Sequence, residues 1–468
     1  MWMMVGITIH LEGEERKPMK FIISETDEIL ISHSGLALAG ALMQGTGIQC
    51  RANYVSLGER RRPEVSNGDV LTSMIALLCL GKPDFEAIEE FRGDEFFHRA
   101  LGLKNIPSEG TLRQRLDELG YRCDVILREE SAAMVARHAP KITACYGEWV
   151  AMDIDVSPFD NSGTKKEGIG WTYKHTEGFA PNFAYLGEEG YLIHCELREG
   201  SQHCQKGTPE FLDAAVGYAR RITQSKILMR MDAGNDDVEN IRRCKKHKNV
   251  DYLIKRNLRN ESLEEWLEEA QAHGEWEFPR EGKEVYTGET WRVLDGKEHR
   301  VVFEVIYRTT TPEGQKLLIP EIEAATWWTS LKLSAKQVIE LYHQHGTSEQ
   351  FHSEIKTDMD LERLPSGKFA TNALVLSLGL MAYNVLRLCG QTALRQNEQL
   401  PAEEKMPIRK PVERRRLRSV MQDLMYLATR LTHHANRLGL SFWRNNPWHK
   451  VWQELYVKFS GRRCPTTQ

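Results

Sequence analysis

The sequence predicts a mixed α/β core that is flanked by helical regions. Residues 146–157 alternate between apolar and polar side chains with a period of two, which is typical of a strand with one buried face. Residues 226–231 form a short apolar run that continues directly into Asp232. Helical patterns separate this run from the strand-like segments before and after it. Strands that alternate with helices indicate a layered α/β fold with a mixed sheet.

Changes of pattern along the chain divide it into five regions. Short β-type runs follow an acidic stretch, so we expect a β-rich insertion in the core. After the insertion, Ser334 is placed to cap a helix, residues 373–388 form a long apolar helix, and the polar segment 396–406 is expected to be a loop. The regions are a mainly helical N-terminal region with a strand-like start (1–145), the first part of the core (146–258), the insertion (259–325), the second part of the core (326–390) and a basic helical C-terminal region (391–468).

Composition and charge are those of a soluble globular protein. The 468 residues are 41% hydrophobic and 27% charged, and they allow about two to four domains. No stretch approaches the ~18 uncharged apolar residues of a membrane span, and the N-terminus lacks the pattern of a signal peptide. We therefore expect a cytoplasmic protein without a membrane partner. The nine cysteines are dispersed, which indicates reduced thiols instead of a disulfide framework.

Two groups of potential metal ligands lie close together in the sequence. They are Cys195 and Cys204 with His194 and His203, and the three histidines His343, His345 and His352. The spacing of the first group matches no zinc module, so we expect buried or loop side chains there. The second group lacks a fourth ligand at a matching spacing, so we expect contacts to a ligand or solvated helix positions.

Basic residues gather near the C-terminus although the chain as a whole has a net charge of −4. Between Arg409 and Arg463 there are 13 Lys and Arg residues and three acidic residues. Such a local excess indicates a face that binds anions, and Arg414, Arg415 and Arg416 are its densest part. The alternative interpretation is the solvated face of a helix.

Residues 106–120 predict a capped amphipathic helix. Ser108 is placed at its N-terminus, three leucines repeat at helical spacing, and Arg113 and Arg115 fall on the opposite face. A short helix, a tight turn and such a helix resemble a helix-turn-helix, which would bring both arginines to DNA. The alternative is a helix that packs inside the protein.

Three acidic residues stand where a metal site needs them. Asp155, with Asp153 on the same strand face, lies near the end of the first core strand, Asp232 follows a later strand, and Glu349 lies far downstream on a predicted helix. Hard divalent cations prefer carboxylate oxygens, and two such ions about 3.5–4 Å apart can activate a nucleophile and stabilise the leaving oxygen of a phosphodiester. Taken singly, each acid is equally compatible with a surface or capping position.

The segment around Glu349 resembles a known family. Bacterial insertion-sequence transposases of one large DDE branch carry the signature Tyr-x2-Arg-x3-Glu-x6-Lys, and this chain has Tyr342, His345, Glu349 and Lys356 at those spacings. The segments AMDIDVS and RMDAGND resemble the motifs of the first and second acid in that branch, and the β-rich insertion between the second and third acid is similar as well. His345 departs from the usual Arg.

The resemblance implies an RNase H-like fold and a DNA transposase. Asp155, Asp232 and Glu349 would be the catalytic acids and would bind two Mg²⁺ or Mn²⁺ ions per active site, with Asp153 as the alternative first ligand. Tyr342 and Lys356 would contact phosphates of the transposon end. His345 could also donate to a phosphate, although it cannot form the bidentate hydrogen bonds of an Arg guanidinium.

The same resemblance implies the partners and the reaction. The partners would be double-stranded DNA, as transposon terminal inverted repeats and as target, and a second copy of the chain on paired ends. Hydrolysis at the transposon end would free a 3′-hydroxyl, which then attacks target DNA. Basic residues, including Lys356 and Arg414–Arg418, would hold the DNA backbone. A bacterial protein of this kind is expected to be cytoplasmic and associated with the nucleoid when bound to DNA.

Tryptophans are frequent in and beside the insertion. They are Trp266, Trp276, Trp291, Trp327 and Trp328. Relatives that form hairpin ends stack an extruded base on a Trp of the insertion, and stacking of this kind contributes about 1–3 kcal/mol. We select Trp291 for this role. The alternative is that these side chains pack a small β core.

Two other functions stay open at the level of sequence. The chain could be a catalytically inactive or domesticated relative that binds DNA, although the presence of all three acids argues against this. It could also be a metal-dependent nuclease without strand transfer. The terminal repeat, the target site, the excision route and the oligomeric state without DNA are not encoded in any pattern that we can identify.

Overall fold

A nine-stranded sheet dominates the computed structural model, which describes residues 22–58, 63–140, 142–402, 405–408, 412–434 and 437–461. The strand order is β10-β11-β12-β13-β9-β8-β2-β6-β7. The strands are β2 (Trp149–Val156), β6 (Asn182–Leu186), β7 (Tyr191–Glu196), β8 (Lys226–Met231), β9 (Val250–Lys255), β10 (Glu275–Arg280), β11 (Lys283–Leu294), β12 (Lys297–Thr310) and β13 (Lys316–Thr329). The strand-like start of the sequence lies outside the described residues.

The five strands β7-β6-β2-β8-β9 form the core of the sheet. β6 is antiparallel to both β2 and β7, whereas β2, β8 and β9 are parallel to one another. This confirms the mixed α/β core expected from the alternation of strands and helices. The turn between β6 and β7 contains Gly187 and Gly190, both with positive φ, and it closes a hairpin.

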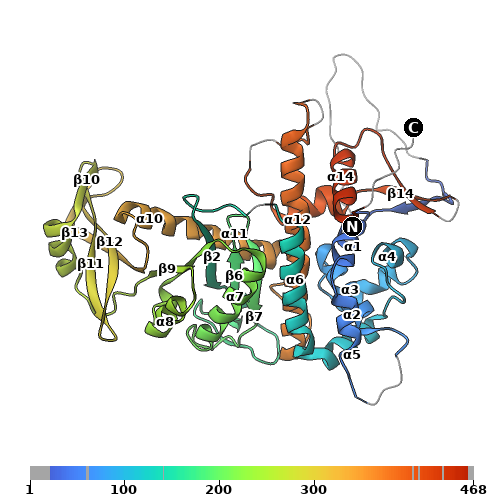
Figure 1. The fold of residues 1–468 in the computed structure, drawn as a ribbon, viewed down its shortest axis with the longest axis horizontal. Coiled ribbons are helices and arrows are strands. Elements are labelled where there is room, and N and C mark those ends of the chain that lie inside the picture. Colours follow the sequence, from blue (N-terminus) through green and yellow to red (C-terminus); the bar gives the residue numbers. More distant parts are fainter. Residues whose placement is uncertain are drawn as a thin grey trace.

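The predicted β-rich insertion is confirmed, and it extends the core sheet instead of forming a separate one. β10 to β13 are a run of antiparallel strands, and the last three residues of β13, Trp327–Thr329, pair with Leu253–Lys255 of β9. The acidic stretch before β10 is the helix α9 (Leu263–His273), and its Trp266 is buried. The insertion therefore projects from one edge of the core (Figure 1).

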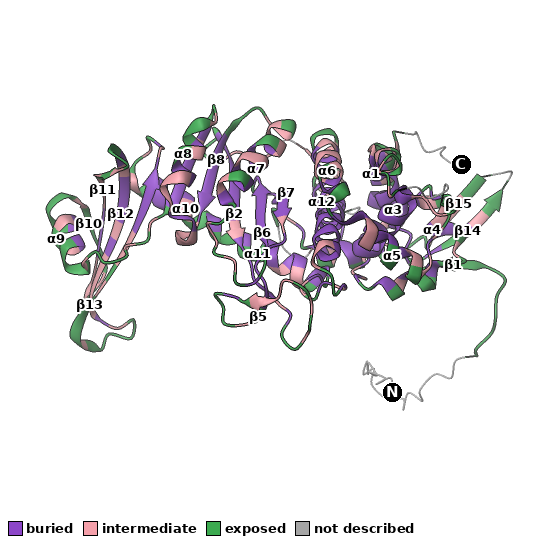
Figure 2. Ribbon diagram, turned by 90° about the horizontal axis from the view of Figure 1, so that it is seen from below, coloured by how far each residue is buried: buried purple, intermediate pink, exposed green. Residues whose placement is uncertain are grey.

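The two faces of the core are covered by different helices. Apolar side chains on one face, such as Met152 and Met229, pack against α7 (Thr208–Ile222) and α8 (Val238–Lys246). On the other face, Ala151 and Leu228 pack against α10 (Ala335–His343). Beyond α10 the chain continues as a short 3-10 turn, α11 (Ser348–Ser353) and a π turn, Glu354–Asp358. Figure 2 shows buried residues concentrated in the core strands and exposed residues at the outer end of the insertion.

A helical body with one hydrophobic core adjoins the sheet. Its longest element, α12 (Phe369–Gln399), packs beside α6 and contacts β7 (Figure 1). The other elements are β1 (Ile29–Ile31), α1 (Leu36–Gln44), α2 (Ile48–Asn53), α3 (Asn67–Cys79), α4 (Glu95–Ala100), α5 (Glu109–Leu119), α6 (Asp124–His138), α13 (Leu417–Val420), β14 (Thr429–His434), β15 (Arg437–Phe442) and α14 (His449–Ser460). The N-terminal and C-terminal regions share this core, since β1 pairs with β14 and α1 contacts α14.

Two predictions for the C-terminal part need correction. The segment 396–406 was expected to be a loop, but α12 continues to Gln399, so the loop begins only at Leu400. The C-terminal region was expected to be helical throughout, but it contains β14 and β15. Thr429 and Leu431 are buried whereas Arg430 is exposed, so the local burial has the period of a strand, and the many basic residues obscure that pattern in the sequence.

α12 is also the one helix, among the described residues, that is long and apolar enough to span a membrane by length and composition. Its apolar window is 100% buried inside the protein. Packing against α3, α6 and β7 therefore accounts for its apolar character.

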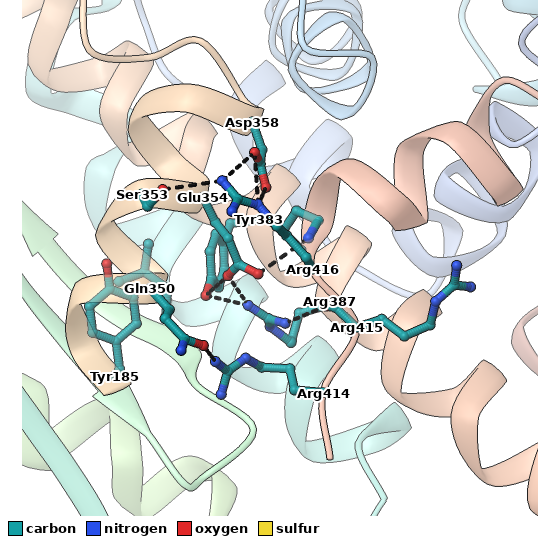
Figure 3. A network of polar contacts seen from close by, with 12 residues as sticks. Tyr185, Gln350, Ser353, Glu354, Asp358, Tyr383, Arg387, Arg414, Arg415 and Arg416 are labelled. Carbon is teal, nitrogen blue, oxygen red and sulfur yellow. Dashed lines mark hydrogen bonds and ion pairs between the residues drawn. The ribbon is translucent and has the colours of Figure 1, made fainter. Parts of the chain in front are cut away.

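A buried polar network joins α12 to the π turn and to the C-terminal segment (Figure 3). The guanidinium of Arg387 donates to the carboxylate of Glu354, to the hydroxyl of Tyr383 at 2.7 Å and to the carbonyl of Arg415 at 2.9 Å. The backbone N–H of Leu417 donates to the same carboxylate at 3.2 Å. Side chains of Arg387 and Glu354 are 1% and 4% exposed, so each charge depends on the other.

We predict that Arg387→Ala lowers the free energy of unfolding by about 3–5 kcal/mol, because it leaves Glu354 as an uncompensated buried charge. Chemical denaturation followed by circular dichroism measures the loss. The double variant with Arg387→Met and Glu354→Leu should lose less than the single one, because it removes both charges. Lys226→Ala, which removes an exposed ion pair with Glu148, is the control and should change stability little. Equal effects of Arg387→Ala and the control would contradict the prediction.

Candidate active site

The register between β2 and β8 brings two acidic side chains together. Ile154 of β2 pairs with Met231 of β8 in a parallel ladder, and the next residues along the two strands are Asp155 and Asp232. Neighbouring strands lie about 4.8 Å apart, and residues at the same level of a parallel ladder point to the same face. The carboxylates of Asp155 and Asp232 therefore share one face at one end of the sheet.

The same register gives Asp153 a different partner. Asp153 pairs with Arg230, and the Arg230 guanidinium donates to both carboxylate oxygens at 2.6 and 2.8 Å. His345 lies 2.8 Å from the same carboxylate, and Asp153 is 1% exposed. Burial alone would raise the pKa of Asp153, but the charges of Arg230 and His345 lower it to about 2. Asp153 is thus the centre of a compensated ion cluster.

Asp155 and Asp232 are a pair of like charges, and among the described residues neither has a Lys or Arg partner. Burial raises the pKa of Asp232, and the negative charge of Asp155 raises it further. The amide of Asn235 donates to Asp232 at 2.8 Å and opposes the shift. Burial also acts to raise the pKa of Asp155, but the hydrogen bond from His352 and the charges of His352 and His345 together outweigh it, and the pKa of Asp155 is lowered. A nearby positive charge would stabilise the ionised form of both carboxylates.

His352 is a contact of Asp155 that the sequence did not indicate. Its Nε2 lies 3.0 Å from Asp155, and its Nδ1 lies 3.1 Å from the hydroxyl of Tyr185 on β6. The imidazole is buried, as is that of His345, so the expectation of solvated helix positions is wrong for both, whereas the alternative of contacts to a ligand stays a prediction. The spacing Glu349-x2-His352 is the signal that was available, because it places the two residues on one helical face.

Glu349 lies on α11, between the two histidines along the helix. His345 contacts Asp153 and His352 contacts Asp155, so the backbone around Glu349 is docked against β2. The Glu349 side chain is exposed, and within the described residues it has no hydrogen bond or ion pair. As the side chains stand, no three His, Cys, Asp or Glu residues in the described part of the chain are grouped closely enough to hold a metal ion.

Two further residues of the Glu349 signature lie near the acids. The phenol of Tyr342 contacts the ring of His345, with 5.7 Å between centroids, and burial and the charges of Asp232 and Asp155 raise its pKa. The ammonium of Lys356 donates to the carbonyl of Pro158, just beyond the end of β2. Burial lowers the pKa of Lys356. These positions agree with contacts to a substrate phosphate, whereas His345 forms an ion pair with Asp153 and its expected phosphate contact stays a prediction.

The basic cluster of the C-terminal region is largely used inside the protein. Arg415 is 6% exposed and pairs with Asp423, so its expected DNA contact is wrong. Arg416 donates to both oxygens of Asp358 at 2.8 and 2.9 Å, although half of its side chain is exposed. Arg414 donates to Gln350 at 2.7 Å and stacks on Phe351 (Figure 3). These arginines hold the segment that follows Glu349.

The helix-turn-helix interpretation is wrong in its geometry. Ser108 caps α5 as predicted, but residues 101–108 separate α5 from α4, which exceeds the turn of about three or four residues in that motif. Arg115 is 8% exposed and donates to Asn67 at 2.8 Å, so it does not face outward. Arg113 is exposed and pairs with Glu109 on the same helix, which leaves it accessible.

Trp291 is exposed, unlike three of the other four tryptophans of this region. Trp291 is 55% exposed on β11 and lines a cavity of about 580 Å³, together with Lys245, Arg300 and Lys332. The other four tryptophans of this region differ in burial, with Trp266, Trp327 and Trp328 buried and Trp276 exposed.

Cys195 and His194 are buried side chains of β7, as expected from their lack of a zinc spacing.

Comparison with known proteins identifies the family. The family model for the transposase DDE domain, group 1, matches residues 19–461. No match is found among curated protein sequences. Among solved structures, the chain is similar to a piggyBac transposase seen in a synaptic complex with hairpin DNA, with 11% identity, 85% of this chain and 80% of that chain covered, and a TM-score of 0.41. Since the family model spans nearly the whole chain, the protein belongs to the DDE transposases.

Proposed function

We propose that this transposase hydrolyses phosphodiester bonds at transposon ends and joins the freed 3′-hydroxyl to target DNA, with Asp155, Asp232 and Glu349 as its catalytic residues. The observation that carries the proposal is the placement of Asp155 and Asp232 directly after the paired residues Ile154 and Met231, where among the described residues neither carboxylate forms an ion pair with a Lys or Arg cation. Asp153, at the preceding position, has that cation in Arg230. Asp155 is therefore favoured over Asp153 as the first acid.

The donor set fits a hard divalent cation. Burial and the charge of Asp155 make ionisation of Asp232 less favourable, and Mg²⁺ is usually bound by one or two carboxylates with waters and substrate phosphate. We propose that Asp155, Asp232 and Glu349 hold two Mg²⁺ or Mn²⁺ ions, with the Glu349 side chain turning toward β2. Bound there, the ions would supply a more acidic water and charge stabilisation at the phosphate.

The surrounding residues position the DNA in this proposal. Lys356 lies beside the end of β2 and would contact a backbone phosphate near the scissile bond. Tyr342 keeps its proton, because burial and the nearby carboxylates raise its pKa, so its hydroxyl can donate to a phosphate oxygen. Arg113 and the exposed part of Arg416 would add weaker, salt-dependent contacts. Two transposon ends require two active sites, so we propose a homodimer on DNA.

We predict that Asp155→Ala, Asp232→Ala and Glu349→Ala each reduce cleavage of DNA that carries the element's own ends by more than about 100-fold, which exceeds the effect of losing an outer-shell partner. Gel assays with Mg²⁺ measure cleaved and joined products. Asp153→Asn should instead lower the stability by about 3–5 kcal/mol, because it leaves Arg230 as an unpaired buried charge.

Three outcomes of that experiment would contradict the proposal. Equal cleavage by wild type and Asp232→Ala would exclude the assigned site. DNA binding without cleavage by the wild type would favour an inactive relative that only binds DNA. Cleavage without joined products would favour a nuclease without strand transfer.

The exposed Trp291 is the proposed stacking platform for an extruded base. Lys245 and Lys332 line its cavity and suit a nucleotide phosphate, whereas Arg300 pairs with Glu289 and Glu298 also lines the cavity. We predict that Trp291→Ala weakens the binding of end DNA by about 1–3 kcal/mol. It should also abolish the quenching of a 2-aminopurine placed beside the cleavage site. Trp443→Ala removes a similarly exposed indole from the C-terminal region and is the matched control. Normal excision by Trp291→Ala would exclude this role.

A further inference from the structure

A chain of three hydrogen-bonded side chains leads from the buried Tyr185 and His352 to the partly exposed Asp155. Tyr185 comes from β6, His352 from α11 and Asp155 from β2, so three separate elements meet in it. We infer that His352 is a positioning residue, which holds the Oδ2 atom of Asp155 and thereby leaves Oδ1 for a divalent cation. The inference rests on the proposed function, because it takes Asp155 as a cation ligand.

The chemistry of the groups fixes the direction of the hydrogen bonds. A carboxylate oxygen can only accept, so Nε2 of His352 carries the hydrogen in the 3.0 Å contact with Asp155. Burial raises the pKa of Tyr185 well above its ordinary value, so its phenol stays neutral. The phenol then donates to Nδ1 of a neutral ring or accepts from a charged one, at 3.1 Å. In both cases the imidazole is held at its two nitrogens.

Packing leaves the imidazole little freedom to turn. The ring of His352 contacts Phe183 at 5.3 Å and Tyr185 at 5.4 Å between centroids. Tyr185 is itself fully buried and contacts Phe351 at 4.8 Å and Tyr383 at 6.2 Å. A histidine that is fixed in this way can hold a carboxylate in one rotamer, as outer partners of metal ligands commonly do.

The second carboxylate oxygen is the open one. Within the described residues, Oδ1 of Asp155 has no side-chain hydrogen bond, whereas both oxygens of Asp153 are occupied. Asp155 and Asp232 share a face, so a held Asp155 has one oxygen available on the face where Asp232 lies. Without His352, the carboxylate could rotate and present either oxygen, and ordering it would then oppose cation binding.

The test measures Mn²⁺ binding to the full-length protein without DNA, from the electron paramagnetic resonance signal of free Mn²⁺. We expect His352→Leu to weaken binding by about 10–100-fold, the usual effect of losing an outer partner of a metal ligand. His352→Gln should recover most of the affinity, because its amide nitrogen can donate to Asp155. Tyr185→Phe removes a single oxygen and keeps the ring packing, and it should weaken binding by a smaller factor.

His194 provides the matched control. It is a buried histidine in the neighbouring strand β7, stacked on Phe211 at 4.3 Å, and its Nδ1 has no hydrogen-bond partner among the described residues. His194→Leu should therefore leave the Mn²⁺ affinity unchanged. Thermal unfolding of every variant shows whether a loss of affinity is a loss of fold.

Asp155→Ala distinguishes a wrong ligand set from a wrong role of His352. Unchanged Mn²⁺ binding by Asp155→Ala would mean that the proposed ligand set is wrong. A loss in Asp155→Ala together with wild-type binding in His352→Leu would overturn the inference on His352 and leave the proposed function intact. Equal losses in His352→Gln and His352→Leu would overturn the donor role. If His352→Leu does not fold, Tyr185→Phe is the remaining test. Unchanged Mn²⁺ binding by Tyr185→Phe would overturn the inference that the hydrogen bond from Tyr185 of β6 holds His352 in place.

Discussion

The parallel register between β2 and β8 is the constraint on which the whole site depends. It sets Asp153 opposite Arg230 and, two residues on, Asp155 opposite Asp232. The first pair is a buried ion pair with two short hydrogen bonds, and the second is a pair of like charges. A slip by one residue would turn these side chains to the other face of the sheet. The same pairing of β2 and β8 therefore produces both the buried ion pair and, at the end of the strands, the pair of like charges.

That arrangement makes the edge a place where positive charge is favourable. Two carboxylates at the ends of neighbouring strands repel each other, and their partial burial increases the repulsion. The compensated pair beside them shows that the fold can place a guanidinium on this face. At the next ladder position it places a second carboxylate instead. This like-charge pair is the observation on which the proposed cation site rests.

Local patterns in the sequence predicted the strands, most of the helices and the acids themselves. Period-two alternation and apolar runs are visible within a few residues, and so are Ser108 and Ser334 as helix caps. The partners of charged residues were not predictable, since Arg115 meets Asn67 and Arg415 meets Asp423 through tertiary packing. The sequence pattern therefore placed these basic residues on the surface, although Arg115 and Arg415 are buried.

The helix that carries Glu349 is held from two sides, and this explains how its side chain can be free while its backbone is not. His345 contacts Asp153 and His352 contacts Asp155, and both contacts hold the helix against β2. On the other side, Arg414 contacts Gln350, and Arg416 binds Asp358 just beyond Glu354, which pairs with Arg387 (Figure 3). Glu349 itself is exposed and unpaired within the described residues. A fixed backbone with a free carboxylate suits an acid whose ligand arrives with the substrate.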